Sequence, residues 1–136
     1  MKLATLDIIF IQETKCSIQK LKKIHSKWMY RFEFLEVKEE NTVGDIFTLW
    51  NPHRNSILDA DASRNYLSVI FKPVRVVDTL LATNVYGPQR IDDKLRLLNS
   101  LAKLRSRHEE IPWVLGGDFN MIKSLSEKKR RHQIAK

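Results

Sequence analysis

The chain has 136 residues, of which 43% are hydrophobic and 29% are charged, and these values are typical of one soluble globular domain with a sizeable core. Its formal net charge of +8 favours a polyanionic partner such as nucleic acid. No apolar run approaches the roughly 20 residues of a membrane helix, and Asp7 interrupts the N-terminal stretch, so neither a signal peptide nor a membrane partner is expected. The single cysteine, Cys16, excludes an internal disulfide and fits a reducing, intracellular compartment.

The positive charge is concentrated in two segments. Residues 123–136 hold six Lys or Arg and one Glu, and we expect a disordered basic tail here, after a domain formed by residues 1–122. The second segment runs from Lys15 to Arg31 without an acidic residue. Both segments can contact phosphate groups, or they can be a solvated helix face and a frayed terminus. Lys128–Arg131 also resembles a nuclear-import cluster, but such short basic runs are common, so the location within the cell stays open, the nucleus included.

The N-terminal half predicts a strand, a helix and further strands. Asp7–Glu13 is apolar on both faces, which is typical of a strand buried on both sides. Ser17 can cap a helix whose apolar residues recur at a helical interval, at Ile18, Leu21 and Ile24. Further strands are expected at residues 30–37, 46–50, 66–71 and 78–85.

The C-terminal half predicts one helix and one strand. Asp92 and Asp93 favour a helix start because they complement the helix dipole. Its expected apolar stripe consists of Leu95, Leu98, Leu101, Ala102 and Leu104. Pro112 ends the helix, and a short buried strand follows at residues 113–115. The alternation of strands and helices predicts an α/β fold.

Three of the expected strands end in polar residues. These strand ends are Ile-Gln-Glu-Thr-Lys at 11–15, Asn-Val-Tyr-Gly-Pro at 84–88 and Gly-Gly-Asp-Phe-Asn at 116–120. Ligands of open α/β sheets bind beyond the carboxyl ends of strands. Glycines at such ends let the backbone approach a ligand closely. We therefore expect a functional site where these three ends meet.

The residue types at these ends suit phosphate chemistry. Glu13 and Asp118 are hard oxygen donors that can hold one Mg²⁺, which would polarise a phosphoryl oxygen. Asn120 can orient Asp118 or bind a phosphate oxygen, and Tyr86 can donate a hydrogen bond to the same phosphate. Each residue has a structural alternative: the carboxylates can cap helices or be solvated, Tyr86 can pack at a rim, and Asn84 can form a turn.

These motifs together resemble a known family. The segments that occur in the order and spacing of the endonuclease/exonuclease/phosphatase superfamily are residues 11–15, 84–88 and 117–120. Residues 113–120 and Leu49-Trp50-Asn51 make the chain similar to the apurinic-endonuclease-like domain of plant non-LTR (LINE-type) retrotransposons. The similarity spans most of residues 6–122. It implies a four-layered α/β sandwich, with two packed mixed sheets flanked by helices, and phosphodiester cleavage with Mg²⁺ or Mn²⁺.

The resemblance also implies a role for each motif residue. Glu13 resembles the metal-binding glutamate, and Asp118 resembles the aspartate that aligns or activates the attacking water. Asn120 resembles the residue that supports Asp118 and the phosphate, and Tyr86 resembles the phosphate-contacting tyrosine. The expected catalytic residues are thus Asp118, Asn120 and Tyr86, and the expected substrate-binding residues are Asn84, Tyr86, Asn120 and Lys15.

The family pattern continues beyond the motifs found in this chain. It includes an asparagine-bearing strand before the first of them and, after Asn120, an aspartate motif and a Ser-Asp-His motif, none of which this sequence contains. We therefore expect a domain truncated at both ends, inactive or weakly active on DNA, because catalytic residues that act as a unit are strongly non-additive. Expected partners are DNA rather than RNA, and the remainder of the domain or a reverse transcriptase.

Two alternatives stay open. In the first, another chain completes the site and the protein is a working Mg²⁺-dependent endonuclease. In the second, the chain is a non-catalytic module that binds nucleic acid through the basic segment from Lys15 to Arg31 and through the tail.

Overall fold

The protein is represented by a computed structural model that describes residues 7–13, 23, 26–27, 31–37 and 45–120. Its elements are, in chain order, β1 (Ile8–Glu13), β2 (Glu33–Val37), β3 (Asp45–Trp50), β4 (Asn55–Ala62), β5 (Tyr66–Pro73), β6 (Leu80–Tyr86), α2 (Ile91–Arg107) and β7 (Trp113–Asp118). Every strand expected from the sequence is present, and β4 is an additional one. The expected burial of residues 113–115 is wrong, because Val114 and Leu115 are 50% and 41% exposed. The α/β prediction is confirmed.

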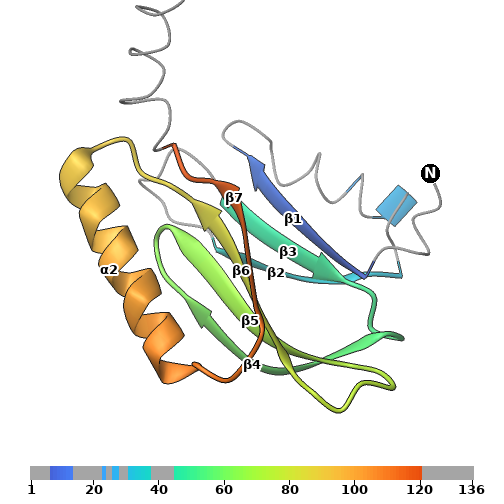
Figure 1. The fold of residues 1–136 in the computed structure, drawn as a ribbon. Helices are drawn as coiled ribbons and strands as arrows, with labels where there is room; N and C mark the ends of the chain where they lie inside the picture. Colours follow the sequence, from blue (N-terminus) through green and yellow to red (C-terminus); the bar gives the residue numbers. More distant parts are fainter. Residues whose placement is uncertain (1–6, 14–22, 24–25, 28–30, 38–44, 121–136) are drawn as a thin grey trace, which may run out of the picture.

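The strands form two sheets that pack face to face, and α2 covers the outer face of the larger sheet (Figure 1). The three-stranded sheet has the order β1-β3-β2 and is antiparallel throughout. The four-stranded sheet has the order β4-β5-β6-β7, and β6 and β7 are parallel because α2 connects them. This confirms the expected α/β sandwich, with the difference that only the larger sheet is mixed. The two sheets and α2 form three of the four layers that the resemblance implies.

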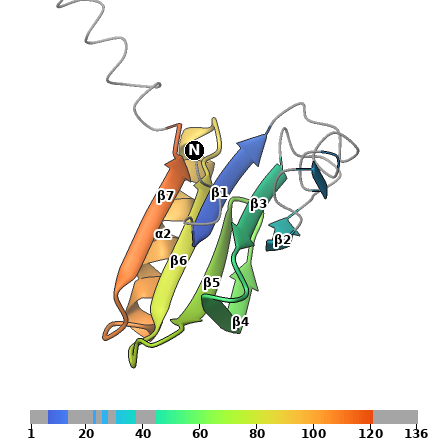
Figure 2. The same ribbon diagram turned by 90° about the vertical axis from the view of Figure 1, so that its right-hand side faces the viewer.

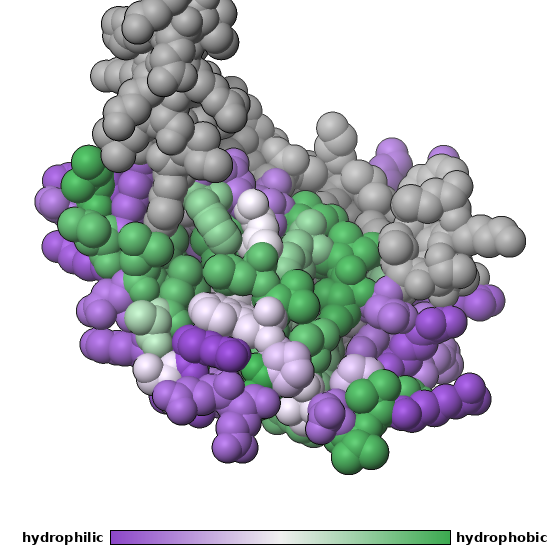
Figure 3. Space-filling model, in the orientation of Figure 1, coloured by the Kyte–Doolittle hydropathy of each residue, from purple (hydrophilic) through white to green (hydrophobic). Residues whose placement is uncertain are grey.

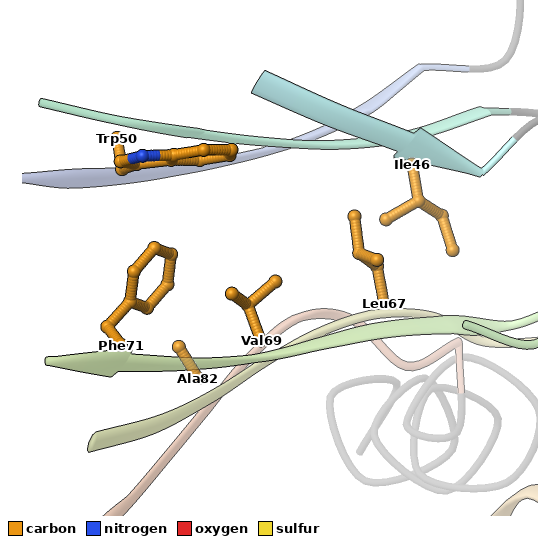
Figure 4. Close-up of a cluster of buried hydrophobic side chains, with 6 residues drawn as sticks. All are labelled: Ile46, Trp50, Leu67, Val69, Phe71 and Ala82. Carbon is orange, nitrogen blue, oxygen red and sulfur yellow. The ribbon is translucent and has the colours of Figure 1, made fainter. Parts of the chain in front are cut away.

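The main core lies between the two sheets. Figure 4 shows Trp50 and Ile46 of the smaller sheet facing the larger one, whose buried side chains here are Leu67, Val69, Phe71 and Ala82. The three residues from β5 alternate along the strand, as the period of two in a strand requires. The rings of Trp50 and Phe71 are 5.7 Å apart and tilted by 60°, a favourable aromatic arrangement. This packing fixes the distance between the sheets and therefore between their strand ends.

The helix α2 packs on the other face of the larger sheet. Its buried face contains Leu97, Leu101 and Leu104. Leu97 and Leu101 belong to a cluster with Tyr66 and Val85. The expected apolar stripe is therefore wrong in part, because Leu95, Leu98 and Ala102 are exposed. The sequence offers two overlapping apolar stripes on this helix, and the sheet buries only one of them.

The unpredicted strand β4 is an edge strand with few apolar residues. Most of its side chains are exposed, and it contains Asp59 and Asp61. Its register with β5 shifts between Ile57 and Asp59, as at a β-bulge. A polar, bulged edge strand lacks the apolar alternation on which strand prediction depends, so this element was missed.

Several expectations fall on residues outside the described ranges. They include Lys15, the Ser17 helix cap with Ile18, Leu21 and Ile24, and the basic tail at residues 123–136. In the same region, Lys23, Ser26 and Lys27 are helical and exposed, which agrees with an outward basic helix face. Among the described residues, no helix is both long and apolar enough to span a bilayer.

Candidate functional site

The carboxyl ends of β1, β6 and β7 lie at the same end of the sandwich. Figures 1 and 2 both show these three strands running in the same direction. The strands β6 and β7 are parallel neighbours, and Tyr86 is paired in register with Asp118. The strand β1 packs across from both of them. The strand ends that the sequence predicted to meet are therefore brought together.

Hydrogen bonds join the ends of β6 and β7 beyond the sheet ladder. The Gly87 N–H donates to the Asp118 carbonyl oxygen at 2.6 Å, and the Asn120 side-chain amide donates to the Gly87 carbonyl oxygen at 2.7 Å. A Cβ atom on Gly87 would lie 1.9 Å from the carbonyl oxygen of Phe119. Only glycine fits at this position. Gly87 is therefore needed for the close contact between the ends of β6 and β7, in addition to any role in a turn.

The same junction orients the carboxylate of Asp118. Its Oδ1 accepts a hydrogen bond from the backbone N–H of Asn120 at 3.0 Å. Asn120 adopts a left-handed conformation, with φ of 57°, which asparagine tolerates better than most residues. Asn120 is buried while Asp118 is exposed. The pair thus presents a carboxylate to solvent at a fixed rotation, an arrangement that suits the predicted support of Asp118 by Asn120.

The two glycines before Asp118 have separate structural reasons. A Cβ atom on Gly116 would lie 3.3 Å from the ring of Phe10, so Gly116 makes room for this β1 side chain between the sheets. Gly117 has φ of 123°, and a Cβ atom there would lie 2.1 Å from the Val85 carbonyl oxygen. The first glycine sets how closely β1 approaches β7, and the second permits the turn of the chain into Asp118.

Asn84 links the two sheets beneath the site. Its side chain is 0% exposed, and its amide donates to the Phe47 carbonyl oxygen at 2.8 Å. Its Oδ1 accepts a hydrogen bond from the side-chain amide of Gln12, one residue before the end of β1. Asn84 is therefore a positioning residue that ties the end of β1 to β6. Its expected contact with substrate stays a prediction, since its amide is already bonded within the protein.

Tyr86 combines packing with a position at the strand end. Its half-buried side chain packs against the core between the sheets. Its backbone is held by Asn65, whose carbonyl accepts from the Tyr86 N–H at 2.8 Å and whose side-chain amide donates to the Tyr86 carbonyl at 3.0 Å. This environment agrees with the alternative interpretation of Tyr86, in which it is a packing residue at the rim of the site. The contact with phosphate stays a prediction.

The predicted metal ligand Glu13 closes β1, where its backbone pairs in register with Asp45. Its side chain and Lys15 lie outside the described part of the structure. Within that part, no group of three or more His, Cys, Asp or Glu side chains is placed to hold a metal ion. Metal binding by the two carboxylates Glu13 and Asp118 stays a prediction; two is a number that suits Mg²⁺, which keeps several waters.

Sequence reasoning missed Gln12 and Asn65, which hold the ends of β1 and β6. Gln12 lies beside Glu13, and Asn65 directly precedes the strand expected at residues 66–71, but no spacing in the sequence indicates that their side chains reach across strands. Gln12 had one usable signal, because a polar residue that follows Phe10 by two positions shares its face toward the other sheet.

No family model and no curated protein matches this chain. Solved structures do match. A humanized TDP2 from D. rerio has a TM-score of 0.63 and 14% sequence identity, over 88% of this chain and 54% of its own. D. rerio TDP2 complexed with a single-strand DNA product has a TM-score of 0.63 and 15% sequence identity, over 88% of this chain and 50% of its own.

A third neighbour is an endonuclease/exonuclease/phosphatase family protein from Bacteroides thetaiotaomicron. It has a TM-score of 0.69 and 14% identity, over 86% of this chain and 50% of its own. This chain thus spans about half the length of the solved structures it matches. At these identities the likeness establishes architecture, and the chain has the fold of endonuclease/exonuclease/phosphatase proteins.

Proposed function

We propose that this chain carries a metal-dependent phosphodiesterase site for DNA, of the endonuclease type, at which turnover is slow or absent. The observation that carries the proposal is the junction of Asp118, Asn120 and Gly87 beside the end of β1, within a fold shared with known phosphoesterases. A neighbour in complex with single-strand DNA product supports DNA as the substrate class.

Each residue of the junction has a role in the proposal. Glu13, together with Asp118, would hold Mg²⁺ or Mn²⁺, which when bound polarises a phosphoryl oxygen. The backbone N–H of Asn120 fixes the Asp118 carboxylate through Oδ1, so that Oδ2 can accept a hydrogen bond from the attacking water. The Tyr86 hydroxyl would donate to the phosphate. Low turnover follows if the histidine motif implied by the resemblance is needed for hydrolysis.

The finer parts of the proposal concern origin and context. We infer a LINE-type retroelement origin from the resemblance of residues 113–120 and 49–51. A nuclear location and association with a reverse transcriptase or with the remainder of the domain belong to the same proposal. Residues 1–122 would form the folded part, and residues 123–136 would form a basic tail.

The test is nicking of supercoiled plasmid by the purified chain, with and without Mg²⁺. We expect slow nicking that requires Mg²⁺ and disappears in Asp118→Asn, while DNA binding is retained. Asp59→Asn is the matched control, because Asp59 is an exposed aspartate on β4, at the opposite edge of the same sheet. Nicking that ignores Mg²⁺, or that survives Asp118→Asn, would contradict the proposal. If no nicking occurs, the proposal still requires the site to bind Mg²⁺, and metal binding is measured in a separate experiment.

A second candidate function is non-catalytic binding of nucleic acid through the basic N-terminal segment. The observation that favours it is the exposure of Lys23, Lys27 and Arg31. This module would not require Mg²⁺ to bind DNA. Its affinity would fall steeply with salt, by a slope that counts the phosphates neutralised. Fluorescence anisotropy at several salt concentrations separates it from a metal-dependent site.

A further inference from the structure

An open pocket lies between the carboxyl-terminal half of α2 and the first residue of β5. Its volume is about 470 Å³, which is within the range of small-molecule sites, and it is lined by Tyr66 of β5 and by Ser100, Lys103, Ser106 and Arg107 of α2. Figure 3 shows hydrophobic surface over the amino-terminal part of α2 and hydrophilic surface around its carboxyl-terminal part. Every side chain that lines the pocket carries a hydrogen-bonding group.

Two of the lining residues are cations on the same face of α2. Lys103 and Arg107 are four residues apart, and like charges at this spacing destabilise a helix slightly. Arg107 lies in the last turn, where a cation complements the helix dipole, but Lys103 lies before that turn. In the described part of the structure, no ion pair involves Lys103. An anion placed between the two cations would turn their repulsion into attraction.

A carboxylate at the wall of the pocket holds two of its lining groups in place. Asp61 Oδ2 lies 3.4 Å from the Arg107 guanidinium and accepts a hydrogen bond from the Tyr66 hydroxyl at 3.2 Å. This single negative charge faces the two positive charges of Arg107 and Lys103, so the pocket keeps a net positive charge. The guanidinium has further N–H groups that Asp61 does not engage, because arginine carries five donors.

The hydroxyl groups of the pocket are oriented to accept hydrogen bonds. The Ser106 hydroxyl donates its proton to the Ala102 carbonyl oxygen at 3.1 Å, and the Tyr66 hydroxyl donates its proton to Asp61. Both oxygens therefore offer lone pairs, whereas the Ser100 hydroxyl can donate or accept. Tyr66 is 6% exposed, so its oxygen lies at the floor of the pocket. A complementary ligand has both an anionic group and hydroxyl groups that donate.

We propose that this pocket binds a small phosphate ester that carries hydroxyl groups, of the size of a sugar phosphate. The phosphate would lie between Lys103 and Arg107, since a guanidinium matches the geometry of phosphate and an ammonium supplies a point charge. Hydroxyl groups of the ligand would donate to the oxygens of Ser106 and Tyr66. None of these residues belongs to the junction at Asp118, so the proposal does not depend on the phosphodiesterase function.

The test is calorimetric titration of the full-length chain with ribose 5-phosphate. Divalent metal is omitted, so that a metal held by Glu13 and Asp118 does not contribute. We expect one molecule bound per chain, with a Kd on the order of 1 mM or below. Ribose and inorganic phosphate should each bind about tenfold more weakly or worse, because each makes only part of the contacts.

Four variants test whether binding occurs in this pocket. Lys103→Gln and Arg107→Gln should each weaken the binding of ribose 5-phosphate by about tenfold or more, because each removes a charge-assisted hydrogen bond. Ser106→Ala should weaken it by about threefold, the usual effect of one neutral hydrogen bond. Arg96→Gln is the matched control, since it removes the same charge from an exposed position of α2 that does not line the pocket. Circular dichroism verifies that each variant is folded.

Adenosine 5′-monophosphate, used as a second probe, distinguishes two sources of the same chemistry. Tighter binding than that of ribose 5-phosphate would identify a nucleotide, and weaker binding would identify a free sugar phosphate. Three results would overturn the proposal. They are no binding of either ester at about 10 mM, affinity for inorganic phosphate equal to that for ribose 5-phosphate, and equal weakening by Arg96→Gln and Lys103→Gln. The last would mean that the overall charge of the helix attracts the anion.

Discussion

At the scale of single residues, Asn84 illustrates how a side chain can serve a site without facing it. It is fully buried between the sheets, and it connects Phe47 and Gln12 to β6. Replacement by alanine would leave the Phe47 carbonyl without this donor and would release the end of β1. We expect Asn84→Ala to lower the free energy of unfolding by about 2 to 4 kcal/mol, through unsatisfied buried polar groups and a cavity.

Urea denaturation measures this change, with Asn99→Ala as the control. Asn99 is exposed on α2, so its replacement should have an effect within about 0.5 kcal/mol. Equal stability of the two variants would show that Asn84 does not link the sheets.

Gly87 and Gly116 make a second comparison at this scale. A methyl group at Gly87 would collide with the backbone of Phe119, whereas at Gly116 it would press on the ring of Phe10 at 3.3 Å. A backbone atom at 1.9 Å cannot move without separating the ends of β6 and β7, but a ring can shift by tenths of an ångström. We expect Gly87→Ala to cost about 3 kcal/mol or more and Gly116→Ala about 1 kcal/mol, measured by thermal unfolding. The reverse order would show that the strand ends are not joined as described.

The sequence predicted the positions of the site residues better than their environments. The polar residues after buried strands identified the ends that meet, because strand direction and apolar runs can be recognised locally. The burial of Asn84 and the bond from Asn120 to Gly87 depend on residues 33 or more positions apart in the chain. Such partners are set by the packing of the two sheets, which no local pattern encodes.

At the scale of elements, α2 shows why a local pattern can favour the wrong face. Leu95 and Leu98 fit a helical stripe as well as Leu97 and Leu104 do, and only contact with the sheet decides between them. The strand β4 was missed for the opposite reason, since its exposed and acidic residues carry no strand signal. Boundaries of the buried strands were predicted to within a few residues because their apolar runs end in turn residues.

A buried tyrosine connects α2 to the edge of the sheet. The Tyr66 hydroxyl donates to Asp61 Oδ2 at 3.2 Å, and Arg107 of α2 also contacts this oxygen, at 3.4 Å. Burial of the phenol, and then the charge of Asp61, raise the pKa of Tyr66 above its ordinary value of 10.0. The folded protein therefore holds this proton more tightly than the unfolded chain does. The resulting stabilisation is fully present below pH 10.0 and is lost as the pH rises through the raised pKa.

An absorbance titration at alkaline pH tests whether the pKa of Tyr66 is raised. We expect a tyrosine ionisation above the ordinary value of 10.0, and this step should vanish in Tyr66→Phe. The variant should also lose about 1 kcal/mol of stability at neutral pH, the usual contribution of one hydrogen bond. A titration that Tyr66→Phe leaves unchanged above pH 10.0 would contradict the buried contact with Asp61.

At the scale of the whole molecule, the described residues form two packed sheets, with α2 on the outer face of the larger one. The matched part of this chain covers about half of the solved structures it resembles, at 54% and 50% of their lengths. The fold class could be predicted because the order of strands and helices follows from apolar periodicity. The order of the strands within each sheet could not be predicted, because it depends on pairing between segments that are far apart in the chain.

The central claim of the functional account is that the ends of β1 and β7 together hold a divalent metal. The measurement that tests it most directly is Mn²⁺ binding to the purified chain, followed by electron paramagnetic resonance with Mg²⁺ as competitor. We predict one competed Mn²⁺ per chain, weakened on the order of tenfold or more by Glu13→Gln and also by Asp118→Asn, because so few carboxylates hold the ion. Glu33→Gln, at an exposed position on β2, should have no effect. Absence of Mn²⁺ binding, or binding equally strong in Glu13→Gln and Glu33→Gln, would contradict the account.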